Sequence, residues 1–291
     1  MSEAIRIQTG RFGRVALLDM DKSLVRHAHP HCHVLLKVDG ADTAFQVGDN
    51  VARLTDENAV LINAWAPHSY VHKPNAPRTV ILALYIELVW LGGFRGNWAA
   101  SAGQHFFETS TGAVTGRIKK LTMNLANSML HAPQATSDHE SLVEELMIAV
   151  IERFCDWREV GTGLGAIATR RAVDGRVGRA ISVIRQEPGM IDNVEHLASV
   201  AGMSRANFFR VFEASTGVTP HVFVNVVRME RAVDAAVNTD MSFGELSEKL
   251  GFSTQGHFTR FFRDHAGAAP SQFRAVSRLG SLNDFLGNLR L

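Results

Sequence analysis

The stretch HAHPHCH, residues 27 to 33, carries a histidine at every second position, with a cysteine between the last two. Neutral imidazole is a common ligand for zinc, copper and non-haem iron, and it also forms hydrogen bonds near neutral pH. Alternate side chains of an extended chain share one side, so the four histidines are expected together and Cys32 opposite them. Pro30 disfavours a fully paired interior strand before about His31. The stretch therefore predicts one row of imidazoles on an extended segment.

The composition is that of a globular protein with room for two domains. The chain has 291 residues, 46% of them hydrophobic and 20% charged, and a net charge of +1. Its longest apolar stretch starts at Thr79, is interrupted by Glu87, and is shorter than the roughly 18 residues of a membrane helix, so a buried strand is expected there. No export signal is visible, and Cys32 and Cys155 imply no disulfide framework. We therefore expect a cytoplasmic protein with no membrane partner.

Short apolar runs separated by turn residues fill the chain from about Val15 to Leu91. They read VALLDMD, HVLLKV, TAFQV, AVLINAW and TVILALYIEL. Asp-Gly and Gly-Asp steps between them favour tight turns between antiparallel strands, and five or more such runs suggest a small barrel or sandwich. Residues 1–110 are therefore predicted to form a β domain.

Apolar residues recur at steps of three and four after about Gly112, which predicts helices over residues 111–160. The first helix ends at Ala132-Pro133, and Ser137 with Glu140 has capping-box spacing for a second helix to about Trp157. One apolar row of the second helix could cover the β domain while the other meets a second copy of the chain, or both rows could form one wide core-facing stripe. A homodimer through this segment is therefore expected as one alternative. The rows are Leu142, Leu146, Val150 and Phe154, and Val143, Met147 and Ile151.

The stretch GTGLGAIATRR, from Gly161, has three glycines in five residues. Such glycine density favours a flexible linker, which we place at residues 161–175. Residues 176–291 then form a separate C-terminal domain.

An internal repeat marks the C-terminal domain. The stretches GMSRANFFRVFEASTGVTPHVF, from Gly202, and GFSTQGHFTRFFRDHAGAAPSQF, from Gly251, share glycine, serine, phenylalanine, arginine and proline in the same order. Each copy is predicted to be a helix-turn-helix unit, with its first glycine turning the chain and a serine, Ser204 or Ser253, capping the second helix. Ser242 and Glu245 form a capping box for the first helix of the second copy.

The second helix of each unit presents polar side chains opposite its buried phenylalanines. Arginine can bond O6 and N7 of guanine together, and glutamine can do the same for N6 and N7 of adenine. A helix starting at Pro220 would separate the two units, so that both could enter successive major grooves about 34 Å apart. The alternative is that these arginines are merely solvated, but the paired copies favour a DNA interface.

The segment from about Arg176 to Arg278 resembles the AraC/XylS family of bacterial transcription regulators, which carry two helix-turn-helix units joined by a long helix. The second-unit signature G-F-S-x-x-x-H-F-x-R-x-F-x-x-x-x-G-x-x-P-x-x-F-R runs from Gly251 to Arg274 and is highly specific. The resemblance implies a regulator, with activation the family's tendency, that binds double-stranded promoter DNA and RNA polymerase. It also implies no enzymatic activity.

Carried over by position, the family's DNA contacts fall near the starts of the two second helices. Arg210 and Arg260 are the strongest candidates. Ala206, Phe209 and Gly256 replace polar residues often found there and are less suited to reading bases, although Phe209 can touch a thymine methyl. With the outward-facing polar residues included, the predicted DNA-binding set is Arg205, Ala206, Asn207, Phe209 and Arg210, and Thr254, Gln255, Gly256, His257 and Arg260.

The N-terminal half resembles the cupin-like domain of such regulators, and APHSY at residues 66–70 resembles the second cupin motif. This places His68 across the barrel from the histidine row, with His72 as a further candidate. Metal-binding cupins follow H-x-H after four or five residues with glutamate; counted from His31 or His33, no carboxylate stands there. A divalent metal on His31, His33 and His68 remains one possibility. The others are imidazoles that bind a small-molecule effector, through His29, His31, His33, His68 and His72, and histidines with only a structural role.

The predicted fold class is thus α+β: a cupin-like β-barrel with central helices, then an all-α domain of two helix-turn-helix units. The predicted function is a ligand-responsive, sequence-specific transcription regulator, in which effector binding shifts the central helices and linker. The competing hypothesis is a cupin-type metal-dependent enzyme, or a metal sensor, fused to a DNA-binding domain. Regulation by another protein, without any effector, is a third.

Overall fold

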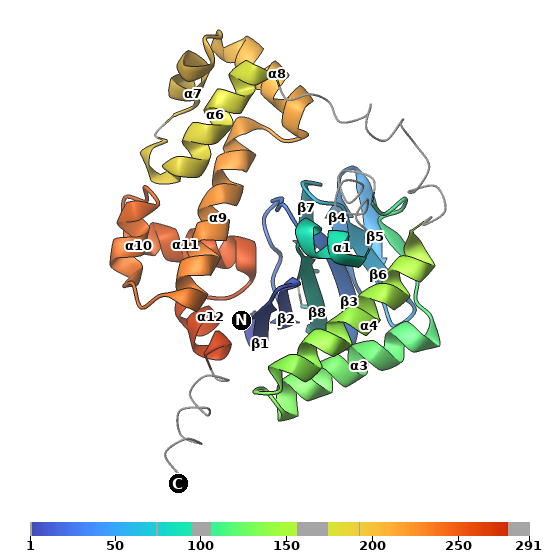
Figure 1. Cartoon of the computed structure of the whole chain (residues 1–291). Coiled ribbons are helices and arrows are strands. Elements are labelled where there is room, and N and C mark those ends of the chain that lie inside the picture. Colours follow the sequence, from blue (N-terminus) through green and yellow to red (C-terminus); the bar gives the residue numbers. More distant parts are fainter. Residues whose placement is uncertain (1, 74, 95–105, 156–173, 192, 279–291) are drawn as a thin grey trace.

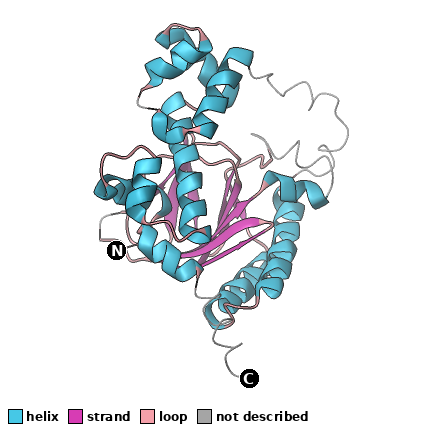
Figure 2. Ribbon diagram, turned by 60° about the vertical axis from the view of Figure 1, so that its left-hand side comes forward, coloured by secondary structure: helices cyan, strands magenta, loops and turns pink. Residues whose placement is uncertain are grey.

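The structure is a computed structural model that describes residues 2–73, 75–94, 106–155, 174–191 and 193–278. An N-terminal β domain has two long helices on one side and a helical C-terminal domain on the other (Figure 1). In Figure 2 the strands lie between these two sets of helices. The predicted α+β class is confirmed. The predicted linker at residues 161–175 falls largely outside the described residues.

The β domain consists of two antiparallel sheets. The larger has the strand order β1-β2-β8-β3-β6-β9, and the smaller has the order β5-β4-β7. All five apolar runs contain a strand, but the sequence did not reveal β1, β5, β7 or β9, and β9 lies in the segment predicted to be helical. The strands are β1 Glu3–Gly10, β2 Gly13–Met20, β3 Cys32–Gly40, β4 Thr43–Val47, β5 Asn50–Leu54, β6 Asn58–Ile62, β7 His68–Val71, β8 Thr79–Ile86 and β9 Thr111–Ala113.

The six-stranded sheet is buried on both faces. In β3, Cys32, Val34 and Leu36 point into the core beneath the two long helices, while Leu35 points into the core shared with the small sheet. This is the period-two alternation of a strand, and it places Cys32 opposite His33 as predicted. Burial raises the pKa of the Cys32 thiol to about 12, so the thiol stays protonated at neutral pH.

The helices of the N-terminal half are α1 Leu88–Phe94, α3 Gly116–His131 and α4 Thr136–Phe154. The prediction of strand throughout the apolar stretch from Thr79 is wrong after Ile86, because β8 ends there and α1 begins at Leu88. The capping box predicted at Ser137 and Glu140 is also wrong: α4 starts at Thr136 and Ser137 lies inside it, so its hydroxyl cannot serve as the cap. Both apolar rows of α4 pack into the same core of this chain, so the wide core-facing stripe is the arrangement found. None of the described helices is long and apolar enough to cross a membrane.

The C-terminal domain contains two helix-turn-helix units, α7–α8 and α10–α11, connected by α9. Gly202 and Gly251 both adopt the left-handed conformation between the paired helices, as predicted (φ 65° and 75°). Ser204 caps α8 and Ser242 forms the predicted capping box, but Thr254 rather than Ser253 caps α11. The helices are α6 Gly175–Gln186, α7 Val194–Ala201, α8 Arg205–Thr216, α9 Pro220–Asn238, α10 Phe243–Lys249, α11 Gln255–Ala266 and α12 Pro270–Ser277, with a 3₁₀ turn at Pro188–Met190.

The two domains share apolar cores. Phe262 of α11 and Phe273 of α12 are buried in the same cluster as Ala16 and Ala83 of the large sheet. The ring of Trp65 stacks on that of Phe223 at the start of α9, with centroids 4.7 Å apart. The helical C-terminal domain is therefore packed against the β domain rather than carried independently of it.

The two turn glycines provide a matched test of this geometry. A side chain at Gly202 would meet no atom within 4 Å, whereas a Cβ at Gly251 would lie 2.2 Å from the carbonyl oxygen of Gly189. We expect Gly202→Ala to cost about 1 to 2 kcal/mol, since alanine disfavours positive φ. Gly251→Ala should cost a further 1 to 3 kcal/mol or so, because the Gly189 backbone must also move. Urea unfolding of both variants measures the difference; equal losses would contradict the close approach.

Candidate DNA interface and interdomain histidine site

The start of α8 is the first candidate surface for DNA. Phe208 and Phe212 are buried and hold the helix on its unit, which leaves Arg205, Ala206 and Arg210 exposed. Arg210 donates a hydrogen bond from Nη2 to Oδ1 of Asn207 at 2.9 Å. Planar arginine and amide groups of this kind can bond base edges or phosphates.

Two predicted positions on α8 are partly engaged within the protein. Arg205 Nε lies 2.7 Å from Oε1 of Glu195 in α7, and its guanidinium is 5.5 Å from the ring centroid of Phe209. Phe209 is only partly exposed and also lies near His221 of α9. DNA would therefore have to compete with Glu195 for Arg205, which makes Arg210 the more accessible arginine.

The start of α11 is the second candidate surface. Gln255, Gly256, His257 and Arg260 are all exposed, above the buried Phe258. The Thr254 hydroxyl accepts a bond from the backbone N–H of His257, so this side chain serves as the helix cap. The His257 ring is held by Ser253, with Nδ1 and Oγ 2.8 Å apart.

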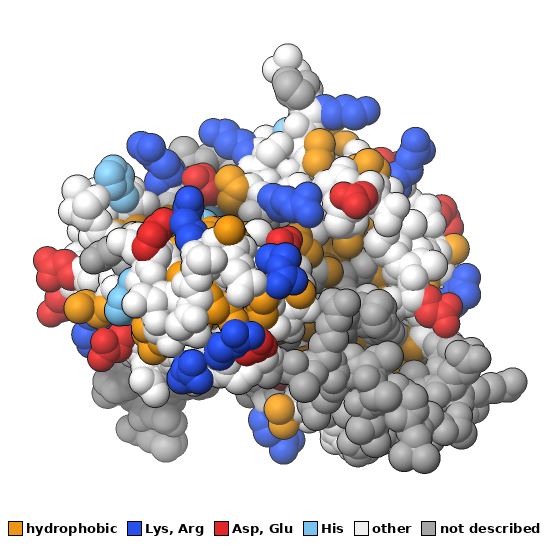
Figure 3. All heavy atoms as spheres, turned by 90° about the horizontal axis from the view of Figure 1, so that it is seen from above, with side chains coloured by type: hydrophobic (Ala, Val, Ile, Leu, Met, Phe, Trp, Pro, Cys, Tyr) orange, Lys and Arg blue, Asp and Glu red, His pale blue; other side chains and the backbone are white. Residues whose placement is uncertain are grey.

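Basic side chains do not form one large patch on the end of the molecule that carries α6, α7 and α8. Figure 3 shows lysine and arginine spread among acidic side chains on this face. Sequence-independent attraction to phosphates depends on the number of basic contacts, so binding here must depend on where individual arginines lie.

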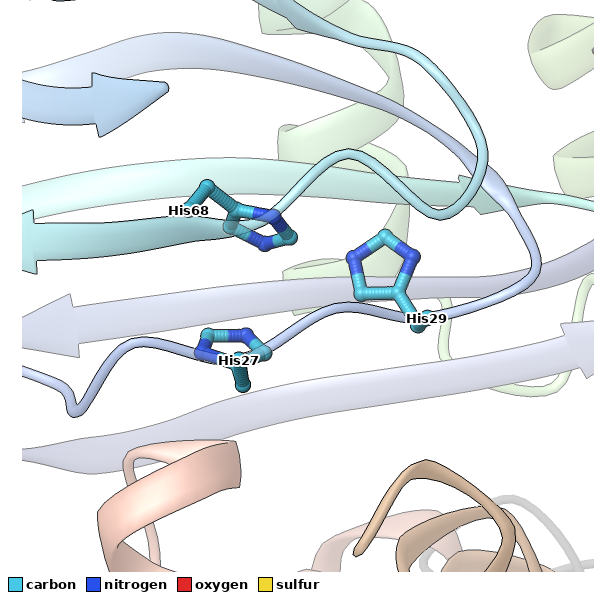
Figure 4. A group of neighbouring side chains, drawn as sticks. All are labelled: His27, His29 and His68. Atoms are coloured by element: carbon cyan, nitrogen blue, oxygen red, sulfur yellow. The ribbon is translucent and has the colours of Figure 1, made fainter. Parts of the chain in front are cut away.

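A cluster of histidines lies where the β domain meets α9 and α11. His27 and His29 come from the segment before β3, and His68 opens β7 and is bridged to His27 through the backbone. Figure 4 shows the three rings converging on one space. Their centroids are 4.4 Å apart for His27 and His68, and 4.9 Å apart for His29 and His68.

The hydrogen bonds of these rings fix their tautomers. Nδ1 of His27 is 2.8 Å from the carbonyl of Val25, and Nδ1 of His68 is 2.9 Å from the carbonyl of Ala66. A carbonyl only accepts, so Nδ1 must carry the proton in each ring and Nε2 must carry a lone pair. His29 follows the same rule, with Nδ1 3.2 Å from the carbonyl of His31.

The remaining predicted histidines are placed differently. His31 Nε2 lies 3.0 Å from Oε1 of Glu87, just after β8, and 3.8 Å from Glu230 of α9. His33 Nδ1 lies 2.7 Å from Nε2 of His29. His72 is outside the cluster, beside the Tyr70 hydroxyl.

The structure thus groups a different trio from the predicted His31, His33 and His68. Within the described part of the chain, the trio with ligand atoms within 4.8 Å of one another is His27, His29 and His68, because His31 turns to Glu87. The sequence held a signal for His27, because His27 and His29 form an earlier H-x-H pair. His33 stands four residues after this pair, which is the spacing at which metal-binding cupins carry their glutamate. No sequence pattern pointed to Glu87, because only folding brings it close to His31.

Comparison with known proteins supports the reading of the C-terminal domain. Residues 197–275 match the helix-turn-helix domain family. A regulator of Haemophilus influenzae is 33% identical over 101 residues, which are 35% of this chain and 34% of that protein. The regulator MtrA of Neisseria gonorrhoeae is 31% identical over 101 residues, with the same coverage. The chain therefore spans about a third of the length of these relatives.

The match to a helix-turn-helix domain over residues 197–275 agrees with the resemblance of the C-terminal domain to the AraC/XylS family. The transcriptional activator NphR of a Rhodococcus species matches more of the chain, with 30% identity over 183 residues, or 60% of this chain and 49% of NphR. Two structures of ToxT from Vibrio cholerae, one apo and one bound to an unsaturated fatty acid, align with TM-scores of 0.55 and 0.53. They cover 93% and 90% of this chain and 99% and 94% of ToxT, at 11% and 10% identity, and show the shared two-domain fold alone.

A pocket opens between the β domain and the helix-turn-helix domain. Its walls include Arg14 and Tyr85 from the sheet, and Met229 and His265 from α9 and α11. The Arg14 guanidinium lies 4.1 Å from the Tyr85 ring centroid, and its buried Nε has no hydrogen-bond partner among the described residues. Of the five histidines predicted to bind effector, His29 lines this pocket, together with the unpredicted His27.

Burial keeps the cluster neutral. It lowers the pKa of His27, His29 and His33 well below the ordinary value, with further lowering from neighbouring histidines, and it lowers the pKa of His68 from 6.5 to about 4. The same cause lowers the pKa of His265. At neutral pH these rings therefore offer lone pairs rather than positive charge.

This lowering makes folding stability depend on pH. Below about pH 6.5 the unfolded chain takes up protons that the folded cluster excludes, so stability contributed by the cluster is complete above that pH and is lost as the pH falls towards 4. We expect the thermal unfolding midpoint, measured with a chelator present, to fall between pH 7 and pH 5. His68→Asn should show a shallower fall, with His72→Gln as the matched control. Parallel curves for wild type and His68→Asn would exclude this origin.

Proposed function

We propose that the protein is a ligand-responsive, sequence-specific DNA-binding transcription regulator. The observation that carries this proposal is the pair of glycine-turned helix-turn-helix units, each with an exposed recognition-helix start and both connected by α9. Arg210 and Arg260 occupy equivalent positions in the two copies, and both are exposed. One chain can thereby bind two neighbouring segments of duplex DNA.

Activation is the mode we propose, since NphR is named a transcriptional activator. RNA polymerase and a second copy of the chain are proposed partners on the family resemblance. The enzyme alternative finds no support, because the relatives are regulators. The proposed binding partner is double-stranded promoter DNA, and the proposed location is the cytoplasm.

We place the effector in the interdomain pocket. Its walls come from both domains, so a ligand there contacts α9 and α11 as well as the sheet. Such a ligand changes DNA binding if it prefers one arrangement of the two domains. Arg14 Nε is a buried donor that has no partner in the described part of the chain, which suits a small organic molecule with an acceptor group near Tyr85.

Arg260→Ala tests the DNA interface. We expect it to weaken the footprint on the promoter beside the protein's own gene by about 1 to 3 kcal/mol, or roughly 5- to 150-fold, if Arg260 reads a base. Arg117→Ala, an exposed arginine of α3, serves as the control and should leave the footprint unchanged. Equal footprints for Arg260→Ala and wild type would remove Arg260 from the interface.

Met229→Trp tests the effector pocket. The larger side chain should fill the space between the domains and abolish the change in footprint that a metabolite panel produces in the wild type. Basal DNA affinity should remain within about threefold, since Met229 lies in α9 and belongs to neither of the two candidate recognition helices, α8 and α11. Met123→Trp, on the exposed side of α3, is the matched control. A normal effector response in Met229→Trp would place the effector elsewhere.

A further inference from the structure

We propose that His27, His29 and His68 bind a divalent transition-metal ion at the boundary between the β domain and α11. The ion class is that of zinc, which accepts neutral imidazole nitrogen in a four-coordinate site. This site goes beyond the proposed regulator function and does not depend on it.

The positions of the three rings suit such an ion. Their ligand atoms lie within 4.8 Å of one another. Around an ion with bonds of about 2.1 Å, tetrahedral ligands lie about 3.4 Å apart, so the rings need to approach by little more than 1 Å. Side-chain rotation on the segment before β3 can supply this movement, since His27 and His29 precede the paired part of the strand.

The hydrogen-bonding pattern also suits metal ligation. Each of the three rings has its Nδ1 proton directed at a backbone carbonyl, which leaves a lone pair on Nε2. The Nε2 lone pair of His29 accepts a hydrogen bond from Nδ1 of His33, which a bound ion would replace. This second bond is the one that typically orients a metal-bound histidine. A histidine with only a structural role would use both nitrogens, yet the buried Nε2 of His68 has no partner among the described residues.

The site is closed off from solvent on two of its three ligands, since His29 and His68 are almost fully buried. The buried Nε2 of His68 has no hydrogen-bond partner among the described residues, which is costly without a cation or water beside it. Metal binding would satisfy this nitrogen.

The ion would lie next to the second recognition helix. The His265 ring of α11 is 5.9 Å from that of His27, and its Nδ1 is 2.7 Å from the Phe261 carbonyl, so its Nε2 also carries a lone pair. The backbone N–H of Val25 bonds the carbonyl of Asp264, which ties the same segment to α11. His265 lines the interdomain pocket together with His27 and His29, so it is placed to supply a fourth ligand. Occupancy would therefore tie α11 more firmly to the β domain.

The first experiment measures metal binding alone. Full-length protein stripped with a chelator is titrated with zinc chloride by calorimetry, and Co²⁺ absorption reports the coordination. We expect one ion per chain, a rise in the unfolding midpoint on binding, and a tetrahedral Co²⁺ spectrum. His27→Gln and His68→Asn should each weaken binding at least 100-fold or so, while His72→Gln should bind as the wild type does.

Each outcome decides the proposal. If His68→Asn does not fold, as judged by circular dichroism, the partly exposed His27→Gln carries the test. No stoichiometric zinc binding, or wild-type affinity in His27→Gln, overturns the site. Loss of binding in His72→Gln to the same extent also overturns it, because binding would then not depend on the trio.

The second experiment measures coupling to DNA. Zinc should change the promoter affinity of the wild type at least fivefold, and His265→Ala should reduce that change while still binding zinc. An unchanged affinity with zinc bound would reject the coupling and leave the site. Zinc binding is measured without DNA, so a failure of the regulator hypothesis and a failure of the metal site are distinguishable.

Discussion

The burial of apolar side chains between the large sheet and helices α9, α11 and α12 is the interaction on which the site depends. It sets Phe262 and Phe273 against Ala16 and Ala83, and it brings α12 alongside β1. Because α11 is held at its C-terminal end, His265 and Asp264 lie over the segment with the histidines, while the start of the helix stays exposed. The same helix thus reaches both the interdomain pocket and the candidate DNA surface.

This arrangement limits how a signal can travel. The distance between pocket and recognition-helix start is spanned by α11 itself, a rigid element of 12 residues, so no chain of loosely coupled side chains is required. What must change is the packing of α9 and α11 on the sheet. A ligand acts only through its preference between two such packings.

The sequence predicted best where one local constraint decides the structure. Gly202 and Gly251 must turn the chain with positive φ, and the repeated phenylalanines must be buried, so the two units could be located without knowledge of the rest. It failed where partners distant in the chain decide: β9 is a strand because it pairs with β6, and α1 follows β8 although its residues are as apolar as the strand before it. The histidine row was recognised, yet its grouping depended on Glu87 drawing His31 away. The spacing of the histidines in the sequence cannot show that a distant carboxylate will bind one of them.

Thermodynamic linkage would connect the proposed metal site, the pocket and the candidate DNA surface. If an ion at His27, His29 and His68 changes the affinity for DNA by some factor, DNA must change the affinity for the ion by the same factor. An organic molecule beside Arg14 would obey the same relation, and His27 and His29 line the same pocket as Arg14. Direct ligation of the ion by that molecule would make the two bind cooperatively, whereas steric overlap would make them compete. The effect of the ion on the affinity for the organic molecule can be measured without DNA. A higher affinity would indicate that the molecule ligates the ion, and a lower affinity would indicate that the two compete for the same space.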